Sequence, residues 1–208
     1  MKHVFILASA SPRRKELVSH LKIPFVVLPA NIDEEVEAPT PSFLVEKLAI
    51  DKGLATHKQF RKEHTDPCFI LSADTLVALG NKIYSKPKDQ KDAARILLEL
   101  SGKTHQVFTG VSFIYENHSE IKTHSFVVES LVTFDLIGNE ILQIYLDTKE
   151  SLDKAGAYGI QGPSLTFISK LEGSYSNVVG LPLSDVVREI GLFLGANSPS
   201  ENWRDIFK

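Results

Sequence analysis

The stretch Val4-Phe5-Ile6-Leu7-Ala8-Ser9-Ala10-Ser11-Pro12-Arg13-Arg14 carries the signals of a buried strand that leads directly into a helix. Residues 4–8 are apolar at every position, as is typical of strands covered on both faces. Ser11-Pro12 then predicts a helix to about Leu21, because serine caps a helix N-terminus and proline suits the first helical position. A buried strand followed at once by a helix indicates an α/β protein.

The pattern continues outward from this stretch as alternating helices and strands. Thr40-Pro41 repeats the cap-and-proline signal, and Gly80-Asn81 is typical of a hairpin turn. Further strands are predicted at residues 25–28, 69–71, 76–79, 82–84, 107–115, 126–134 and 165–169, and further helices at residues 41–56, 89–100, 140–146 and 184–194. This order favours an α/β fold with a mixed sheet. Because no Pro/Ser-rich linker interrupts it, residues 1–208 are expected to form a single domain.

Composition narrows the classes of function. The chain has 208 residues, of which 43% are hydrophobic and 24% charged, so it falls in the ordinary globular range. A formal charge of −3 argues against a partner held mainly through a nucleic-acid backbone. The single cysteine, Cys68, excludes a disulfide framework and is read as a small core residue.

The pattern of the first residues does not match a targeting segment. No run approaches the roughly 18 apolar residues that span a bilayer, so no membrane partner is expected. The short apolar start resembles a signal peptide, but the charged residues 13–16 follow too soon. The expected compartment is therefore the cytoplasm.

The helix start at residue 12 breaks an electrostatic rule. Helix N-termini favour acidic side chains, yet Arg13 and Arg14 stand here. Two guanidinium groups, the hydroxyls of Ser9 and Ser11 and the unpaired backbone N–H groups would form a polyphosphate site. The alternative is that the arginines extend into solvent or pair with the acidic residues at positions 33 and 34.

Asp74 and three lysines are the next candidates. Asp74 lies between two apolar runs, so it is expected at a strand end or bend, where it could hold a divalent cation or orient an attacking water. The alternative is an aspartate that binds turn amides. Lys52, Lys86 and Lys103 could neutralise a triphosphate, although solvated surface lysines are equally consistent with the pattern.

A glycine-rich segment, residues 156–162, contains three glycines and Gln161. Glycine lets backbone approach a ligand closely, and the Gln161 amide offers a donor and an acceptor that match a uracil or thymine edge. The alternative is a flexible loop whose glutamine faces water.

Three common site motifs are excluded. Leu97 stands where a P-loop needs its first glycine before Gly102-Lys103-Thr104, and that segment follows a helix rather than a strand. The histidines lack zincin spacing, and residues 173–177 do not form a serine-hydrolase elbow.

Taken together, these segments resemble the Maf family of nucleoside triphosphate pyrophosphatases. The matching text runs in order from residue 4 to about 190 and comprises residues 7–17, Ala73-Asp74-Thr75, Lys86-Pro87, residues 100–105, 153–162 and 173–183. The segment at residues 154–162 resembles the branch that acts on dTTP and UTP, rather than the branch that acts on 7-methyl-GTP. Leu76 and the pair Lys52-Gly53 depart mildly from the family pattern.

The resemblance implies a fold and a reaction. The fold would be an elongated mixed sheet flanked by helices, with two lobes around a central cleft, related to inosine-triphosphate pyrophosphatases and often a homodimer. The reaction would be hydrolysis of a nucleoside triphosphate to the monophosphate and pyrophosphate, dependent on a divalent cation, Mg²⁺ or Mn²⁺.

The resemblance also implies roles for individual residues. Asp74 matches the proton acceptor, and it is also the candidate metal ligand. The positions that match substrate-binding residues are Ser9, Arg13, Arg14, Lys52, Lys86 and Gln161. The positions that match residues linked to base selectivity are Arg13, Thr75 and Gln161. An acidic loop at Asp33, Glu34 and Glu35 either helps to hold the metal or is solvated.

Two other functions stay open at this point. One is a non-catalytic, nucleotide-sensing regulator of septum formation, and the other is a pyrophosphatase with methylated-purine specificity. A retired site has no physical need for Asp74, Lys86 and Gln161 together, which favours the enzyme.

Overall fold

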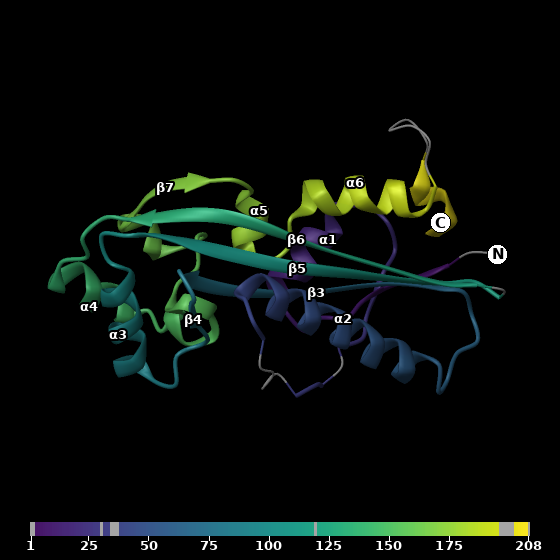
Figure 1. Cartoon of the computed structure of the whole chain (residues 1–208), viewed down its shortest axis with the longest axis horizontal. Coiled ribbons are helices and arrows are strands. Elements are labelled where there is room, and N and C mark those ends of the chain that lie inside the picture. Colours follow the sequence, from purple (N-terminus) through teal and green to yellow (C-terminus); the bar gives the residue numbers. More distant parts are fainter. Residues whose placement is uncertain (1–2, 30, 34–37, 119, 196–201, 208) are drawn as a thin grey trace.

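A computed structural model describes residues 3–29, 31–33, 38–118, 120–195 and 202–207. Its centre is one sheet in the order β2-β1-β3-β5-β6-β7, with β4 paired to β3 (Figure 1). The strands are β1 (Val4–Leu7), β2 (Val26–Val27), β3 (Cys68–Leu79), β4 (Lys82–Tyr84), β5 (Thr104–Glu116), β6 (Ile121–Phe134) and β7 (Ile168–Glu172). β1 runs parallel to β2 and β3, and the remaining pairs are antiparallel. The predicted mixed α/β fold is therefore confirmed.

Helices cover this sheet along its length. They are α1 (Pro12–Ser19), α2 (Pro41–Phe60), α3 (Gln90–Leu100), α4 (Asn139–Asp147), α5 (Tyr175–Val179) and α6 (Leu183–Phe193). Short 3₁₀ turns are η1 (Glu150–Asp153), η2 (Ala155–Ala157), η3 (Pro163–Thr166) and η4 (Trp203–Phe207). In the described part of the chain, no helix combines the length and the apolarity that a membrane span requires.

Capping explains where two of these helices begin. The Ser11 hydroxyl accepts from the Arg14 amide at the start of α1, and the Thr40 hydroxyl accepts from the Phe43 amide at the start of α2. Each cap contributes about 1 kcal/mol. Both predicted helix starts are confirmed, although α2 continues to Phe60 instead of ending near Thr56.

Two strand predictions are wrong in an informative way. Ser72-Ala73-Asp74-Thr75 does not separate two strands, because β3 passes through it without a break. Asp74 therefore lies inside a strand rather than at a strand end or bend. The predicted strand at residues 165–169 is largely a 3₁₀ turn, since Pro163 suits the first helical position, and β7 begins only at Ile168.

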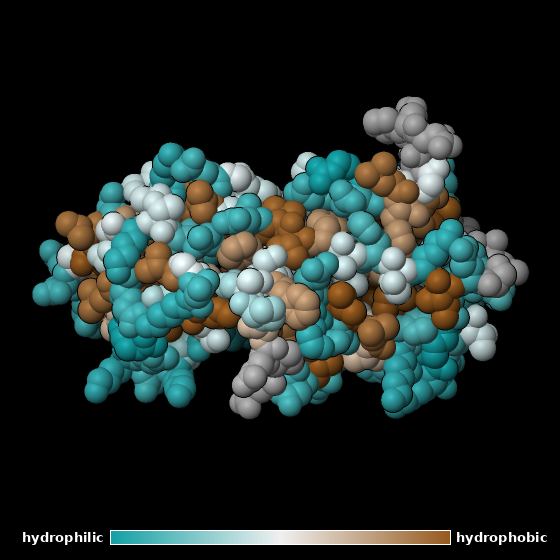
Figure 2. All heavy atoms as spheres, viewed as in Figure 1, coloured by the Kyte–Doolittle hydropathy of each residue, from teal (hydrophilic) through white to brown (hydrophobic). Residues whose placement is uncertain are grey.

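Two hydrophobic cores lie beside each other on one face of β3 and β5. The α3–α4 core contains Leu97 of α3 and Tyr145 of α4, and it reaches Val77 of β3. The α1–α6 core contains Val18 of α1 and Ile190 of α6, and other residues of it come from β3 and β5. The space-filling view shows an elongated molecule (Figure 2). The two cores correspond to the two expected lobes.

The opposite face of the sheet is covered by α2. Even-numbered β3 residues face it, since the Ser72 hydroxyl donates to the Ala49 carbonyl and Leu76 packs on Val45. Gly110 of β5 is essential for this close packing, because a Cβ there would lie 2.4 Å from the Val45 carbonyl oxygen. α2 is therefore fixed at short range over the middle of β3.

Candidate functional site

The edge of β3 contains a gap between two neighbouring strands. β1 pairs with residues 68–71 of β3, whereas β4 pairs with residues 77–79 of the same strand. Among the described strands, none pairs with this edge of β3 at residues 72–76, which include Asp74 and Thr75. The interruption lies next to the junction of the two cores, so the chain leaves its central strand open where the lobes meet.

Chain segments approach this gap from both sides. On one side, the Ala8 amide donates to the Leu71 carbonyl, and the chain then turns through Ser9 into α1. On the other side, the antiparallel register of β4 directs the residues after Tyr84, including Lys86, back toward Thr75. The end of β1, the N-terminus of α1 and the segment after β4 thus converge on one stretch of β3.

Asp74 and Lys52 form an ion pair at the centre of this stretch. Lys52 Nζ of α2 lies 2.5 Å from Asp74 Oδ1, and the two side chains are only 14% and 15% exposed. Ion pairs shielded to this degree are screened less by solvent than surface pairs. The short distance between α2 and the sheet places Lys52 within reach, so the pair fixes the orientation of the Asp74 carboxylate.

Arg14 is held on the other face of β3. Its Nε donates to the Gly180 carbonyl at 2.8 Å, and its two terminal nitrogens donate to the hydroxyls of Thr75 at 3.0 Å and Ser9 at 3.4 Å. Thr75 in turn lies 2.9 Å from the Thr109 hydroxyl. Because side chains alternate along a strand, Asp74 and Thr75 present a carboxylate and an arginine-bound hydroxyl on opposite faces of the same strand.

Arg13 takes a different direction from Arg14. Its guanidinium lies 3.3 Å from Asp153 Oδ2 in η1, and Lys154 Nζ lies 2.6 Å from the other Asp153 oxygen. Burial alone would raise the pKa of Asp153, but the hydrogen bond from Lys154 and the charges of Lys154 and Arg13 hold it below its ordinary value. Within the described part of the chain, Arg13 thus binds Asp153, whereas Arg14 binds the Gly180 carbonyl and the hydroxyls of Thr75 and Ser9.

The remaining predicted residues lie on segments near the gap or away from it. Gly156 of the glycine-rich segment packs against Val77, three residues from Asp74, which brings that segment to β3. Lys86 and Gln161 are exposed. Lys103 is away from the gap, in the connection from α3 to β5, and donates to the Glu99 carbonyl. Glu34 and Glu35 lie outside the described residues.

Sequence reasoning missed two of the contacts that build this arrangement. The Gly180 carbonyl at the end of α5 and the Asp153 carboxylate bind the two arginines, at separations of 166 and 140 residues. No local pattern marks a backbone carbonyl as a partner, and Asp153 carries no spacing signal toward Arg13. Both contacts depend on tertiary structure.

A second cluster of chemically active side chains lies at another end of the sheet. His57, Cys68 and Glu116 place one donor atom each within 4.8 Å of one another, a geometry that could hold a metal ion. Burial raises the pKa of the Cys68 thiol to about 11. The sequence indicated only a core residue at Cys68, and it gave no signal of this cluster.

The comparisons with known proteins agree on one family. A family model described as Maf-like protein matches residues 4–193. A dTTP/UTP pyrophosphatase of Bacillus cytotoxicus is 42% identical over 190 residues, which cover 91% of this chain and 95% of the relative. A dTTP/UTP pyrophosphatase of Thermosipho africanus is 44% identical over 181 residues, which cover 87% and 88%.

Among solved structures, a nucleoside-triphosphatase / dITP/XTP pyrophosphatase from Mycobacterium abscessus is similar at 16% identity, with a TM-score of 0.39. The match covers 96% of this chain and 100% of that one.

Proposed function

The chain belongs to the Maf family, and from this premise we propose that it is a pyrophosphatase that hydrolyses dTTP and UTP to the monophosphate and pyrophosphate. The observation that carries the proposal is the gap in the β3 edge. There, the shielded Asp74–Lys52 pair lies on one face of β3, and Arg14, held by Thr75, lies on the other. Both lie beside the stretch of the β3 edge with which no described strand pairs. Relatives named as pyrophosphatases do not favour a purely regulatory role.

The N-terminus of α1 would bind the phosphate chain. Backbone N–H groups at a helix start attract anions, and the guanidinium of Arg14 lies on the same segment. Arg13 would join when phosphate oxygens replace Asp153 as its partner, and Lys86 would approach from the β4 side. Several cations are needed, because a triphosphate carries close to four negative charges.

Asp74 would act on the attacking water. Its carboxylate would accept a proton from water as the oxygen bonds to the α-phosphorus and pyrophosphate leaves. Lys52 would keep the carboxylate oriented through the 2.5 Å contact. Positioning and charge stabilisation would supply most of the rate gain.

A divalent cation fits this donor set. Mg²⁺ and Mn²⁺ prefer oxygen ligands, and nucleotide enzymes hold Mg²⁺ with one or two carboxylates plus phosphate oxygens. Asp74 is the carboxylate at the gap that would hold it. When bound, such a cation would supply positive charge to the phosphate oxygens.

Base selectivity is assigned to Arg13, Thr75 and Gln161. Gln161 would read the pyrimidine edge with its amide donor and acceptor. Gln161→Ala should lower the preference for dTTP and UTP over other triphosphates, because a site built to hydrogen-bond a group discriminates strongly against its absence. Gln143→Ala is the matched control, since Gln143 binds Asp147 on the exposed surface of α4. An unchanged substrate profile in Gln161→Ala would remove Gln161 from this role.

The direct test of the function is a product assay. The purified chain is incubated with Mg²⁺ or Mn²⁺ and a panel of pyrimidine, purine and methylated triphosphates, and monophosphate and pyrophosphate are quantified. Equal amounts of dTMP or UMP and pyrophosphate support the proposal. Release of orthophosphate and a diphosphate, or binding without turnover, would contradict it.

Two wider expectations accompany the proposal. The homodimer implied by the family resemblance and the cytoplasmic location expected from the sequence stay predictions. Sedimentation of the purified chain and fractionation of cells that express it test them.

A further inference from the structure

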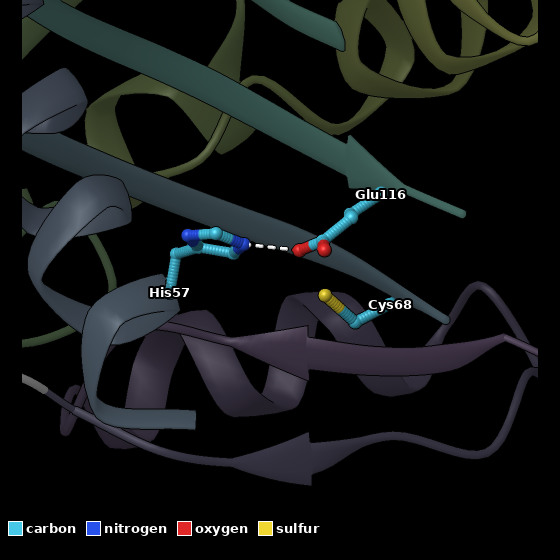
Figure 3. A group of neighbouring side chains, drawn as sticks. All are labelled: His57, Cys68 and Glu116. Carbon is cyan, nitrogen blue, oxygen red and sulfur yellow. Dashed lines mark hydrogen bonds and ion pairs between the residues drawn. The ribbon is translucent and has the colours of Figure 1, made fainter. Parts of the chain in front are cut away.

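Three side chains of different chemistry meet at the end of the sheet that carries Cys68 and Glu116. These two residues lie directly opposite each other, as a cross-strand pair of β3 and β5. His57 reaches them from α2 and forms a hydrogen bond with Glu116 through its Nε2. Figure 3 shows the imidazole, the thiol and the carboxylate pointing toward one another. A nitrogen, a sulfur and an oxygen donor thus come from three separate elements within 4.8 Å.

We propose that His57, Cys68 and Glu116 bind a thiophilic divalent cation, with Zn²⁺ as the ion that suits them best. Zn²⁺ accepts thiolate, imidazole and carboxylate ligands, and three protein ligands plus water complete its four-coordinate shell. Cys68 is fully buried, whereas His57 and Glu116 are each about one-fifth exposed, so the site is shielded yet open to an entering ion. The thiol proton passes to solvent as the sulfur–metal bond forms.

Arg61 shows that this location already stabilises positive charge. Its Nε lies 2.7 Å from the Glu116 carboxylate, and a terminal nitrogen lies 3.3 Å from Cys68 Sγ. The same guanidinium also donates to the carbonyls of His64 and Asp66. These two carbonyls would retain Arg61 when a metal ion takes over its contacts to Glu116 and Cys68.

A neighbouring cavity provides the room for this exchange. It has a volume of about 250 Å³, and Arg61, His64 and Glu116 are among the residues that line it. Glu116 is therefore both a ligand and part of the cavity wall. An ion can reach the cluster from this side, and the Arg61 side chain can withdraw into the same space.

The proposed site is separate from the gap in the β3 edge. Cys68 and Asp74 are six residues apart on β3, which corresponds to roughly 20 Å along an extended strand. The ligand sets also differ, because the gap offers a carboxylate that suits Mg²⁺ and the cluster offers a thiol and an imidazole. The inference therefore does not depend on the proposed function.

Titration with Co²⁺ tests the proposal through the thiolate. Cys68 is the chain's single cysteine, so any thiolate-to-cobalt charge-transfer band reports this residue alone. We expect the reduced full-length chain to develop this band with one equivalent of Co²⁺ and to lose it when Zn²⁺ is added. Cys68→Ser should abolish the band and weaken Zn²⁺ binding at least about tenfold.

Three further variants distinguish the residues that bind the metal ion from residues that only lie near it. His57→Gln should weaken Zn²⁺ binding while keeping the thiol, and it carries the test if Cys68→Ser does not fold. His64→Gln is the matched control on the cavity wall and should bind as the wild type does. Arg61→Gln should tighten binding, because it removes the competing charge.

The proposal is overturned if stoichiometric Co²⁺ gives no charge-transfer band with the wild type. Equal Zn²⁺ affinities of the wild type, Cys68→Ser and His57→Gln, each shown by circular dichroism to be folded, would also overturn it.

Discussion

Asp74 and Lys52 differ from an ordinary surface ion pair in their shielding. Lys47 and Asp51 on the same helix are 41% and 34% exposed, whereas Lys52 and Asp74 are 14% and 15% exposed. Exposed pairs of the first kind contribute at most about 1 kcal/mol. A lysine held against a carboxylate inside a strand therefore indicates a role beyond surface stabilisation.

Asp74→Asn tests that role most directly. Asparagine can still accept a hydrogen bond from Lys52, but it cannot take a proton from water. We expect kcat for dTTP hydrolysis to fall about 10²- to 10⁴-fold, with the thermal melting curve still cooperative. Asp51→Asn makes the same chemical change in the exposed pair and should leave kcat unchanged. Near-normal turnover by Asp74→Asn would remove the carboxylate from the mechanism.

His105 makes the stability of the fold depend on pH. It is fully buried in β5, lies 2.8 Å from the Tyr158 hydroxyl, and burial lowers its pKa from 6.5 to about 4. Between these values the unfolded chain binds a proton that the folded chain does not, so stability falls as the pH falls. The loss from pH 7 to pH 4.5 should be about 2–3 kcal/mol.

Urea denaturation at the two pH values measures this contribution. His105→Gln keeps a hydrogen-bonding group toward Tyr158 but does not titrate, so its stability should change less between pH 7 and pH 4.5. The difference between the two proteins isolates His105 from the other acidic and basic groups. If both lose the same free energy of unfolding, His105 is not the titrating group.

Among the elements, α2 has the strongest influence on the candidate site. It carries Lys52, and its distance from the sheet is set by Gly110, where a Cβ would meet the Val45 backbone. Gly110→Ala must push α2 away or distort β5, which should cost about 1–3 kcal/mol in the free energy of unfolding. Because Lys52 moves with the helix, kcat should also fall under conditions where the variant is folded.

Gly138→Ala is the control for this substitution. A Cβ at Gly138 has no heavy atom within 4 Å, and its φ of −69° suits any residue. Because Gly138 caps α4 without a side-chain hydrogen bond, we expect the cost of alanine there to stay below about 1 kcal/mol. Equal unfolding midpoints for Gly110→Ala and Gly138→Ala would show that the close packing of α2 is not needed.

The sequence predicts elements whose signals are local. The starts of α1 and α2 follow from Ser11-Pro12 and Thr40-Pro41, because a cap and a proline act within one helical turn. The polar run at residues 72–75 misleads, because its partners come from elsewhere in the chain. Ser72 binds the Ala49 carbonyl, and Asp74 binds Lys52. A strand with polar residues in its middle can be recognised only once those partners are known.

The candidate site likewise combines features that local sequence predicts with features that depend on distant parts of the chain. Its residue types could be selected from the sequence, since each pattern matches a known chemistry. Their mutual placement could not, because it depends on the register of β1 and β4 along β3. The different directions of Arg13 and Arg14 likewise result from Asp153 and the Gly180 carbonyl, which no spacing rule connects to them.

At the scale of the whole molecule, a polar junction separates the two cores. Along β3, Ala73 belongs to the α1–α6 core and Val77 to the α3–α4 core, with Thr75 between them. Along β5, Thr109 lies in the same way between Val111 and Val107. We define the polar junction as Thr75, Thr109, Ser130 and Asn177. It lies next to the open stretch of β3, so the lobes meet through hydrogen bonds at the candidate site.

Asn177 is the centre of the polar junction. It is fully buried, and its amide nitrogen donates to the Val107 carbonyl at 3.1 Å and to the Ser130 hydroxyl at 3.0 Å. Its backbone carbonyl accepts from the Thr109 hydroxyl. It also lies in α5, which Gly180 follows directly, and the Gly180 carbonyl accepts a hydrogen bond from Arg14. Asn177 thus connects the packing of the lobes to the position of Arg14.

Asn177→Ala should therefore affect stability and catalysis together. Buried groups that lose a hydrogen-bond partner cost about 1–3 kcal/mol, and we expect a loss of this size in urea denaturation. A displaced Arg14 would lower kcat/KM for dTTP by about 10- to 100-fold at a temperature where the variant is folded. Asn139→Ala, at the exposed start of α4, should change neither quantity. A destabilised Asn177→Ala with wild-type kcat/KM would show that the polar junction only supports packing, because Arg14 would then be positioned without it.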